Sequence, residues 1–147
     1  MILDAITCIA LAVYHEAGSD YVSDVDKQSV AYTVDNRSGN RNQDHCEVIA
    51  EKGQFSHLTH RFKLRQITDG QYQTTFKPDA LPDIEREAWQ HSLDIARDVK
   101  LHQVPDPTNG AEYFHQHHVH PKWSRTFKMT LRTSVFKFYQ DKRSVLG

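Results

Sequence analysis

"AITCIALAVYHEAGSD", residues 5–20, is the stretch that decides how this chain folds. It is apolar on almost every side up to the carboxylate of Glu16, and Gly18 and Ser19 then follow as residues that end a helix. A helix that is apolar all round packs on several sides, so we expect a buried helix over residues 4–17. Glu16 is either a solvated last-turn residue, or a carboxyl held at a cleft whose low polarity raises its pKa and makes it a proton donor.

Three more helices are predicted from the spacing of apolar residues. They cover residues 24–37, 47–52 and 83–100, and Asp44 and Asp83 are the expected N-caps of the last two. These segments would pack around the first helix and make the domain mostly helical.

The remaining segments are predicted from turn signals and alternation. Residues 53–82 have weak periodicity, so we expect a long loop with short turns there, and "PDPTNG" over 105–110 predicts a turn. Apolar residues alternate with polar ones near the C-terminus, which predicts a half-buried hairpin (Phe127, Met129, Leu131, Phe136 and Phe138). The predicted fold class is therefore α+β, mostly helical, one domain over residues 1–147 with a small antiparallel β element near the C-terminus.

Length and charge restrict the function. The 147 residues carry a formal net charge of −1 with mixed signs, which gives no electrostatic case for nucleic acid. Residues 122–143 hold seven basic side chains and only Asp141 as an acid, so this segment either meets an anionic polymer or is a solvated face. The first apolar run is too short to span a bilayer, is interrupted by Asp4 and lacks a basic start, so we expect no membrane insertion and no signal peptide.

Cysteine and histidine usage predicts neither a disulfide nor a metal site. Cys8 lies in the predicted first helix and Cys46 at the start of the short helix that follows, which favours two buried free thiols, and their spacing matches no zinc motif. In "HQHHVH" (115–120), His115 and His117 would share one face of a strand and His118 and His120 the other, so four ligands do not converge. We expect no metal and no cofactor, and histidines that line a polysaccharide groove instead.

Four segments occur in an order that points to one family. They are "QSVAYTVDNR" (28–37), "CEVIAEKGQFS" (46–56), "DPTNGAEYFHQHHVHPKW" (106–123) and "FKFYQ" (136–140). With these segments the chain resembles the SleB/CwlJ-type cell wall hydrolases, which cut the glycan strands of peptidoglycan. The resemblance extends over about residues 12–139.

The resemblance implies a lysozyme-like, lytic transglycosylase-like fold and a catalytic glutamate. The family's Tyr-x-Glu-Ala sequence is matched at residues 14–17, so Glu16 would be the acid/base that cleaves the β-1,4 bond between N-acetylmuramic acid and N-acetylglucosamine. In a lytic transglycosylase the 6-hydroxyl of the muramic acid attacks C1 and gives a 1,6-anhydro product, so one glutamate suffices. Two alternatives stay open: a hydrolysing muramidase whose second carboxylate is Asp20, Asp24 or Asp26, and a non-catalytic glycan-binding module.

The resemblance and the residue chemistry also give the expected substrate contacts. The family's Asn-Arg pair, its Gly-Gln-Phe-Ser stretch and an aromatic-histidine pair are matched here, and exposed aromatic rings stack on sugars. Phe55 and Phe114 are expected in the core. The predicted substrate-binding residues are Tyr14, Asn36, Arg37, Gln54, Ser56, Tyr113, His115, His117 and Trp123.

The chain departs from the family pattern at two places. An arginine expected after Glu-Ala is missing, and Phe136 stands where the family commonly has a histidine, whose role is then absent or passed to His115, His117 or His118. The expected protein is a monomer that acts on peptidoglycan strands of the cell wall, made in a host cytoplasm as a phage endolysin.

Overall fold

Helix α1 (Ala5–Ala17) is the centre of the structure, a computed structural model that describes residues 2–51 and 55–141. The Asp4 side chain caps it by accepting a hydrogen bond from the Thr7 backbone N–H. All side chains from Cys8 to Tyr14 are buried, because α1 packs against α2 (Asp24–Arg41), α3 (His45–Ala50), α4 (Ser56–Phe62) and α5 (Asp83–Lys100). The predicted buried helix ending at residue 17 is confirmed.

The other predicted helices exist: α5 has the predicted bounds, whereas α2 and α3 have shifted ends. Helix α2 continues four residues past the predicted end and stops at Asn42, which takes the left-handed conformation with φ 52°. Gly39 lies in the last part of this helix, where its neighbourhood is open. Helix α5 has Pro82 rather than Asp83 as its N-cap, and Ile84, expected on its apolar face, is 73% exposed. Helix α3 begins two residues early, directly after the predicted cap Asp44.

The prediction of a loop over residues 53–82 is wrong. The described part of this range contains helix α4, an antiparallel hairpin of β1 (Arg65–Thr68) and β2 (Gln71–Gln73), and the short 3₁₀ helix η1 (Pro78–Ala80). The periodicity is weak because each element is short and gives the core only a few side chains, among them Leu58, Phe62, Leu64 and Tyr72.

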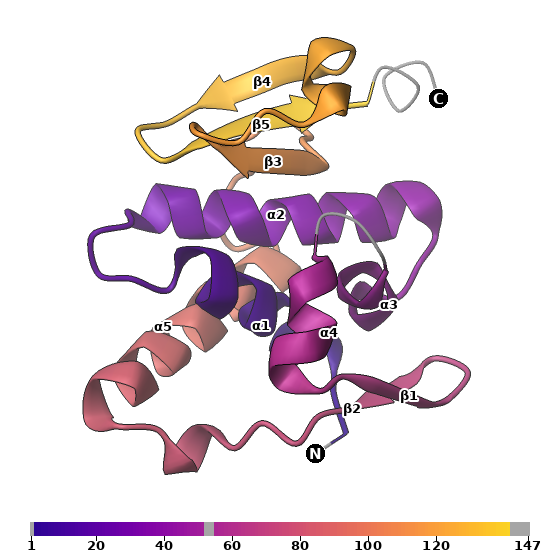
Figure 1. Cartoon of the computed structure of the whole chain (residues 1–147), viewed down its shortest axis with the longest axis vertical. Coiled ribbons are helices and arrows are strands. Elements are labelled where there is room, and N and C mark those ends of the chain that lie inside the picture. The colour runs from indigo at the N-terminus through magenta and orange to yellow at the C-terminus, as the bar shows by residue number, and fades with distance from the viewer. Residues whose placement is uncertain (1, 52–54, 142–147) are drawn as a thin grey trace.

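The C-terminal third forms a three-stranded antiparallel sheet. Its strands β3 (Tyr113–Gln116), β4 (Lys128–Arg132) and β5 (Phe136–Gln140) lie in the order β3-β5-β4, and the 3₁₀ helix η2 (Lys122–Arg125) stands between β3 and β4 in sequence. Figure 1 shows this sheet on one side of α2, with α1 and α5 on the other. The buried side chains of Phe114, Phe136 and Phe138 belong to the same core as α1. The predicted hairpin and the α+β class are confirmed.

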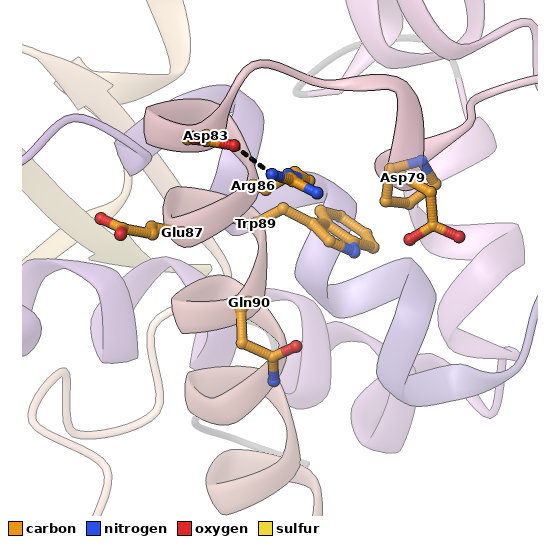
Figure 2. Close-up of a pocket in the computed structure, with 7 residues that line it drawn as sticks. Asp79, Asp83, Arg86, Glu87, Trp89 and Gln90 are labelled. Carbon is orange, nitrogen blue, oxygen red and sulfur yellow. Dashed lines mark hydrogen bonds and ion pairs between the residues drawn. The ribbon is translucent and has the colours of Figure 1, made fainter.

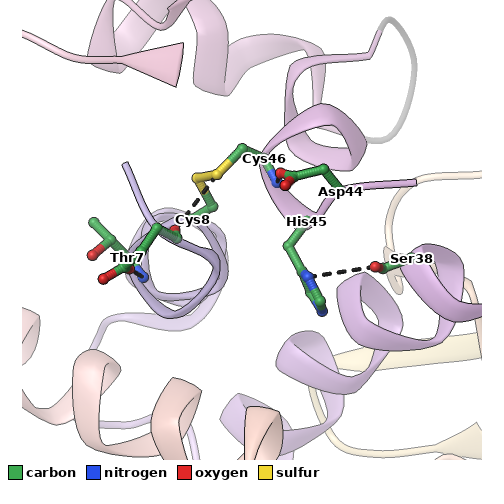
Figure 3. The surroundings of a disulfide bond; sticks show 7 residues. Thr7, Cys8, Ser38, Asp44, His45 and Cys46 are labelled. Atoms are coloured by element: carbon green, nitrogen blue, oxygen red, sulfur yellow. Dashed lines mark hydrogen bonds between the residues drawn. A yellow bond between two sulfur atoms is a disulfide. The ribbon is translucent and has the colours of Figure 1, made fainter. Parts of the chain in front are cut away.

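Cys8 and Cys46 are joined by a disulfide, so the prediction of two free thiols is wrong. Figure 3 shows the bond joining α1 to α3. The two cysteines are 38 positions apart, and only the packing of α3 on α1 brings their side chains together. The bond therefore ties the first helix directly to a helix that follows α2 in the chain.

Among the described residues, no helix is both long enough and apolar enough to cross a membrane. The most apolar helix, α1, has 13 residues, whereas a spanning helix needs about 20. Its apolar side chains are used in the core of the domain.

Candidate active site

Glu16 lies in the last turn of α1, at the wall of a cleft of about 310 Å³. Its side chain is only 21% exposed. Four separate parts of the chain meet here, because α1 ends where α4, α5 and one end of the C-terminal sheet come together. The residues that line the cleft are Tyr14, His15, Glu16, Gly18, Ser19, Tyr21, Val22, Arg61, Glu85, Gln116 and Val135.

The cleft keeps the Glu16 carboxyl protonated up to neutral pH. Burial raises the pKa of Glu16 from 4.5 to about 7, and the nearby Arg61 guanidinium lowers this pKa only in part. The position at the C-terminal end of a helix acts in the same direction as burial, since the negative end of the helix dipole disfavours a carboxylate. Glu16 can therefore both donate and accept a proton near pH 7.

His15 does not supply a compensating positive charge. Burial lowers the pKa of His15, and the charges of Arg61 and His57 lower it further. Arg61 Nη1 lies 2.8 Å from His15 Nδ1, and because a guanidinium can only donate, Nδ1 is the acceptor. The neutral ring then carries its proton on Nε2, which is 3.9 Å from Glu16 Oε1.

Tyr14 and Glu85 also line the cleft. The Tyr14 hydroxyl donates a hydrogen bond to Glu85, and burial together with this carboxylate raises the pKa of Tyr14 to about 12. The Tyr14 ring packs edge-on against Trp89, with the ring centres 5.7 Å apart. Tyr14 is thus a fixed phenol that holds its proton across the physiological pH range.

Glu85 is the functional candidate that the sequence did not reveal. The start of α5 carries several exposed acids, and nothing in their order indicates which one faces the cleft. Asp20, Asp24 and Asp26, the predicted second carboxylates, are not among the lining residues. Asp24 binds His91 at 2.7 Å, and Asp26 is buried at the start of α2.

Asn36 and Arg37 connect α2 to the segment before β3 and do not line the cleft. Asn36 Nδ2 donates to Asp106 Oδ2 at 3.0 Å and to the Ala111 carbonyl at 2.9 Å. Arg37 is only 4% exposed, donates to the Glu112 carbonyl, and lies 4.2 Å from the centre of the Tyr113 ring. Burial lowers the pKa of Arg37 to about 10. These contacts position β3, whose last residue lines the cleft.

Of the predicted substrate-binding aromatics, Tyr14 lines the Glu16 cleft, whereas Tyr113 and Trp123 lie in an aromatic cluster at the C-terminal sheet. Trp123 packs on Tyr113, Phe127 and Tyr139, with ring centres 5.1–5.6 Å apart. His115 is 7% exposed beneath this cluster and hydrogen-bonds the Tyr139 hydroxyl at 2.9 Å. The cluster is half-buried, and none of its members lines the cleft.

His117 follows the end of β3, so it does not share a strand face with His115 as predicted. Its Nε2 lies 2.8 Å from the carbonyl oxygen of Thr133, in the turn that places Val135 in the cleft. Gln54 lies outside the described residues, and Ser56 is the first residue of α4. Within residues 2–51 and 55–141, no three His, Cys, Asp or Glu side chains are grouped so that they could hold a metal ion.

Lys27 holds the turn that follows Glu16. Its side chain is 4% exposed, and Nζ donates to the carbonyls of Ala17 at 2.6 Å and Ser19 at 2.8 Å. Gly18 between them has no room for a side chain, because a Cβ there would lie 2.3 Å from the Tyr14 carbonyl oxygen. The chain therefore leaves α1 along one defined path beside the cleft.

A second cavity, of about 490 Å³, lies beside the start of α5 (Figure 2). Asp79, Asp83, Arg86 and Glu87 line it, and Asp83 forms an ion pair with Arg86. These four side chains are exposed. Trp89 lines the cavity too, but its ring is buried and packs on Tyr14. None of the acids here has the burial that raises the pKa of Glu16, which makes the Glu16 cleft the stronger candidate for acid/base chemistry.

The Glu16 carboxyl should titrate with a midpoint near pH 7. We expect carbon-13 NMR of the side-chain carboxyl to show this midpoint, since burial is the largest cause of the raised pKa. In Arg61→Gln the midpoint should move higher, because the guanidinium charge lowers the pKa of Glu16. A midpoint near pH 4.5 in the wild-type protein would contradict the prediction that burial raises the pKa of Glu16.

Comparison with known proteins gives one match. A protein-family model described as Cell Wall Hydrolase matches residues 23–139. Neither the curated proteins nor the solved structures contain a match, so the lysozyme-like likeness of the fold stays a prediction. The matched range extends from just before α2 to the penultimate residue of β5 and begins seven residues after Glu16.

Proposed function

This chain belongs to the Cell Wall Hydrolase family, whose enzymes act on peptidoglycan, and we propose that it cleaves the glycan strand with Glu16 as its acid/base. The bond broken is the β-1,4 linkage between N-acetylmuramic acid and N-acetylglucosamine. Because Glu16 precedes the range matched by the family model, its role rests on the cleft. The observation that carries the proposal is a buried carboxyl with a pKa of about 7 in a cleft lined by four parts of the fold.

The first step needs a proton at the leaving oxygen. Glu16 is about half protonated at pH 7, because its pKa is about 7, so it can give this proton to the glycosidic oxygen as the C1–O bond breaks. The resulting Glu16 carboxylate then serves as a base. The Nε2 atom of neutral His15 lies 3.9 Å from Glu16 Oε1, which is longer than a hydrogen bond, so His15 is a neighbour of this carboxylate and not its hydrogen-bond donor in the free protein.

We propose the lytic transglycosylase route for the second step. The 6-hydroxyl of the same muramic acid attacks C1, its proton passes to Glu16, and the product is a 1,6-anhydro sugar with no water consumed. One acid/base residue serves both halves of this reaction. The support is that Glu85, the other acid lining the cleft, already accepts the hydrogen bond from Tyr14.

Hydrolysis is the second candidate, and one observation favours it. Glu85 lines the same cleft as Glu16, so the domain does hold two carboxyls in one site, as most glycosidases require. In that reaction Glu85 would activate water or stabilise the cation at C1. Asp20, Asp24 and Asp26 do not line the cleft.

The products distinguish the two routes. Purified peptidoglycan is digested in water labelled with oxygen-18, and the soluble fragments are analysed by mass spectrometry. Transglycosylation should give anhydro fragments without label, whereas hydrolysis should give reducing ends that carry one labelled oxygen. Binding to the strands with no fragments released would instead identify a non-catalytic module and overturn the proposal.

A further inference from the structure

The charges of this domain are divided between its two parts. Residues 113–147 carry seven Lys and Arg side chains and one acid, whereas residues 1–112 carry eleven basic and eighteen acidic side chains. The basic part contains the C-terminal sheet, and the acidic part contains the helices. An overall charge of −1 hides this separation.

Two of these cations lie opposite one another in the sheet. Arg132 of β4 pairs with Lys137 of β5, so their side chains stand on the same face. Like charges in directly opposed positions destabilise a sheet. Neither side chain forms an ion pair within the described residues, whereas Arg41, Arg86 and Arg97 in the helical part all do.

This pair lies at the end of the sheet that borders the Glu16 cleft. The turn between β4 and β5 follows Arg132 and contributes Val135 to the cleft, and the neighbouring Gln116 at the end of β3 lines it too. Lys137 is two residues from Val135, about 7 Å along an extended strand. The hydrogen bond from His117 to the Thr133 carbonyl holds this turn in place.

We propose that Arg132 and Lys137 bind the carboxylates of the peptide stems that hang from the glycan strand in the cleft. The inference rests on the proposed function, because it places the strand next to these cations. Stems are attached to the muramic acids of the strand being cut, so their carboxylates come within reach of side chains adjacent to the cleft. Arg132 is exposed, and a guanidinium suits a carboxylate because its donors match the two oxygens.

The pair then contributes to substrate choice. A strand with stems gains charge-assisted hydrogen bonds at the sheet, and a strand without them leaves two opposed cations unneutralised. The sheet would thus make cleavage depend on the peptide part of the polymer, although the bond that is cut lies between sugars.

The test compares strands that carry stems with strands from which an amidase has removed them. The double variant Arg132→Gln with Lys137→Gln should lower kcat/KM on stem-bearing strands about tenfold or more, since each lost contact involves a charged group. On stem-free strands the double variant should have the same kcat/KM as the wild-type protein. Lys122→Gln is the matched control, because it removes a charge from the exposed part of the basic segment outside the Arg132–Lys137 row, and it should leave both rates unchanged.

Two results would overturn the inference while leaving the proposed function intact. One is an equal rate for the double variant and the wild-type protein on stem-bearing strands. The other is an equal loss on both substrates, which would indicate damage to the fold or the cleft.

Failure of the proposed function has a different signature, namely no fragments from either substrate with the wild-type protein. The inference is then tested by binding alone: isolated stem peptides at millimolar concentration should shift the NMR signals of Arg132 and Lys137 in the wild-type protein. Absence of these shifts would overturn it.

Discussion

Glu16→Gln should lower the rate of glycan cleavage about a thousandfold, within the range that a positioned acid/base contributes. Glutamine has nearly the same shape as glutamic acid, but it can neither give the proton to the leaving oxygen nor take one back. The measurement is the release of soluble fragments from purified peptidoglycan at pH 6. Glu87→Gln is the matched control, because Glu87 is an exposed acid of α5 in the second cavity, and it should keep full activity.

The same substitution should stabilise the folded protein at high pH. The pKa of Glu16 is about 7 in the folded protein and 4.5 in the reference state, so between these values the folded state holds a proton that the unfolded state has lost. This contribution to stability is complete below pH 4.5 and is lost as pH rises through 7. At pH 8 glutamine should therefore raise the free energy of unfolding by up to about 3 kcal/mol, from 1.36 kcal/mol per pKa unit.

At pH 4 the two proteins should unfold with similar free energies. An inactive Glu16→Gln protein that is also less stable at pH 8 would contradict this account, because its inactivity would then follow from a damaged fold. Glu85→Gln separates the two routes: activity should persist in a transglycosylase and fall strongly if Glu85 activates water.

Loss of the Cys8–Cys46 disulfide should lower the free energy of unfolding by about 4 kcal/mol, from the chain entropy of a closed loop spanning 38 positions. The cross-link limits the unfolded chain, so its removal gives that chain more conformations while most native contacts of α1 remain. Urea unfolding of the wild-type protein with and without dithiothreitol measures the effect.

The double variant Cys8→Ala with Cys46→Ala is the control for the reductant. It should match the reduced wild-type protein closely and should not respond to dithiothreitol. Unfolding midpoints that are equal for oxidised and reduced wild-type protein would show that the bond adds nothing to stability. In cells, such a bond persists in oxidising compartments, which fits a substrate outside the cytoplasm.

Sequence reasoning succeeded where one local pattern determines the structure. The apolar run of residues 5–15 predicted α1 and placed Glu16 at its end, because a helix that is buried on all sides is made almost entirely of apolar residues. Alternation likewise predicted the β4–β5 hairpin. Both features depend on residues that are close together in the chain.

The features that sequence reasoning missed depend on contacts between distant segments. Glu85 lines the cleft only because α5 packs on α1 with the Glu85 side of the helix toward the cleft. The disulfide forms only because α3 packs on α1. The resemblance predicted Asn36 and Arg37 as substrate-binding residues, whereas in the structure both side chains contact the segment before β3. A family motif indicates which side chains the family shares, but it does not indicate whether they contact the substrate or other parts of the protein.

Lys27 has a consequence for how the cleft receives its substrate. Its two hydrogen bonds satisfy carbonyl groups at and just beyond the end of α1, and they hold the chain in one conformation before any ligand arrives. Ordering a loop during association costs conformational entropy, which reduces affinity. Because this segment is ordered in advance, sugar binding does not have to bear that cost, and the carboxyl meets each new glycosidic bond from the same direction.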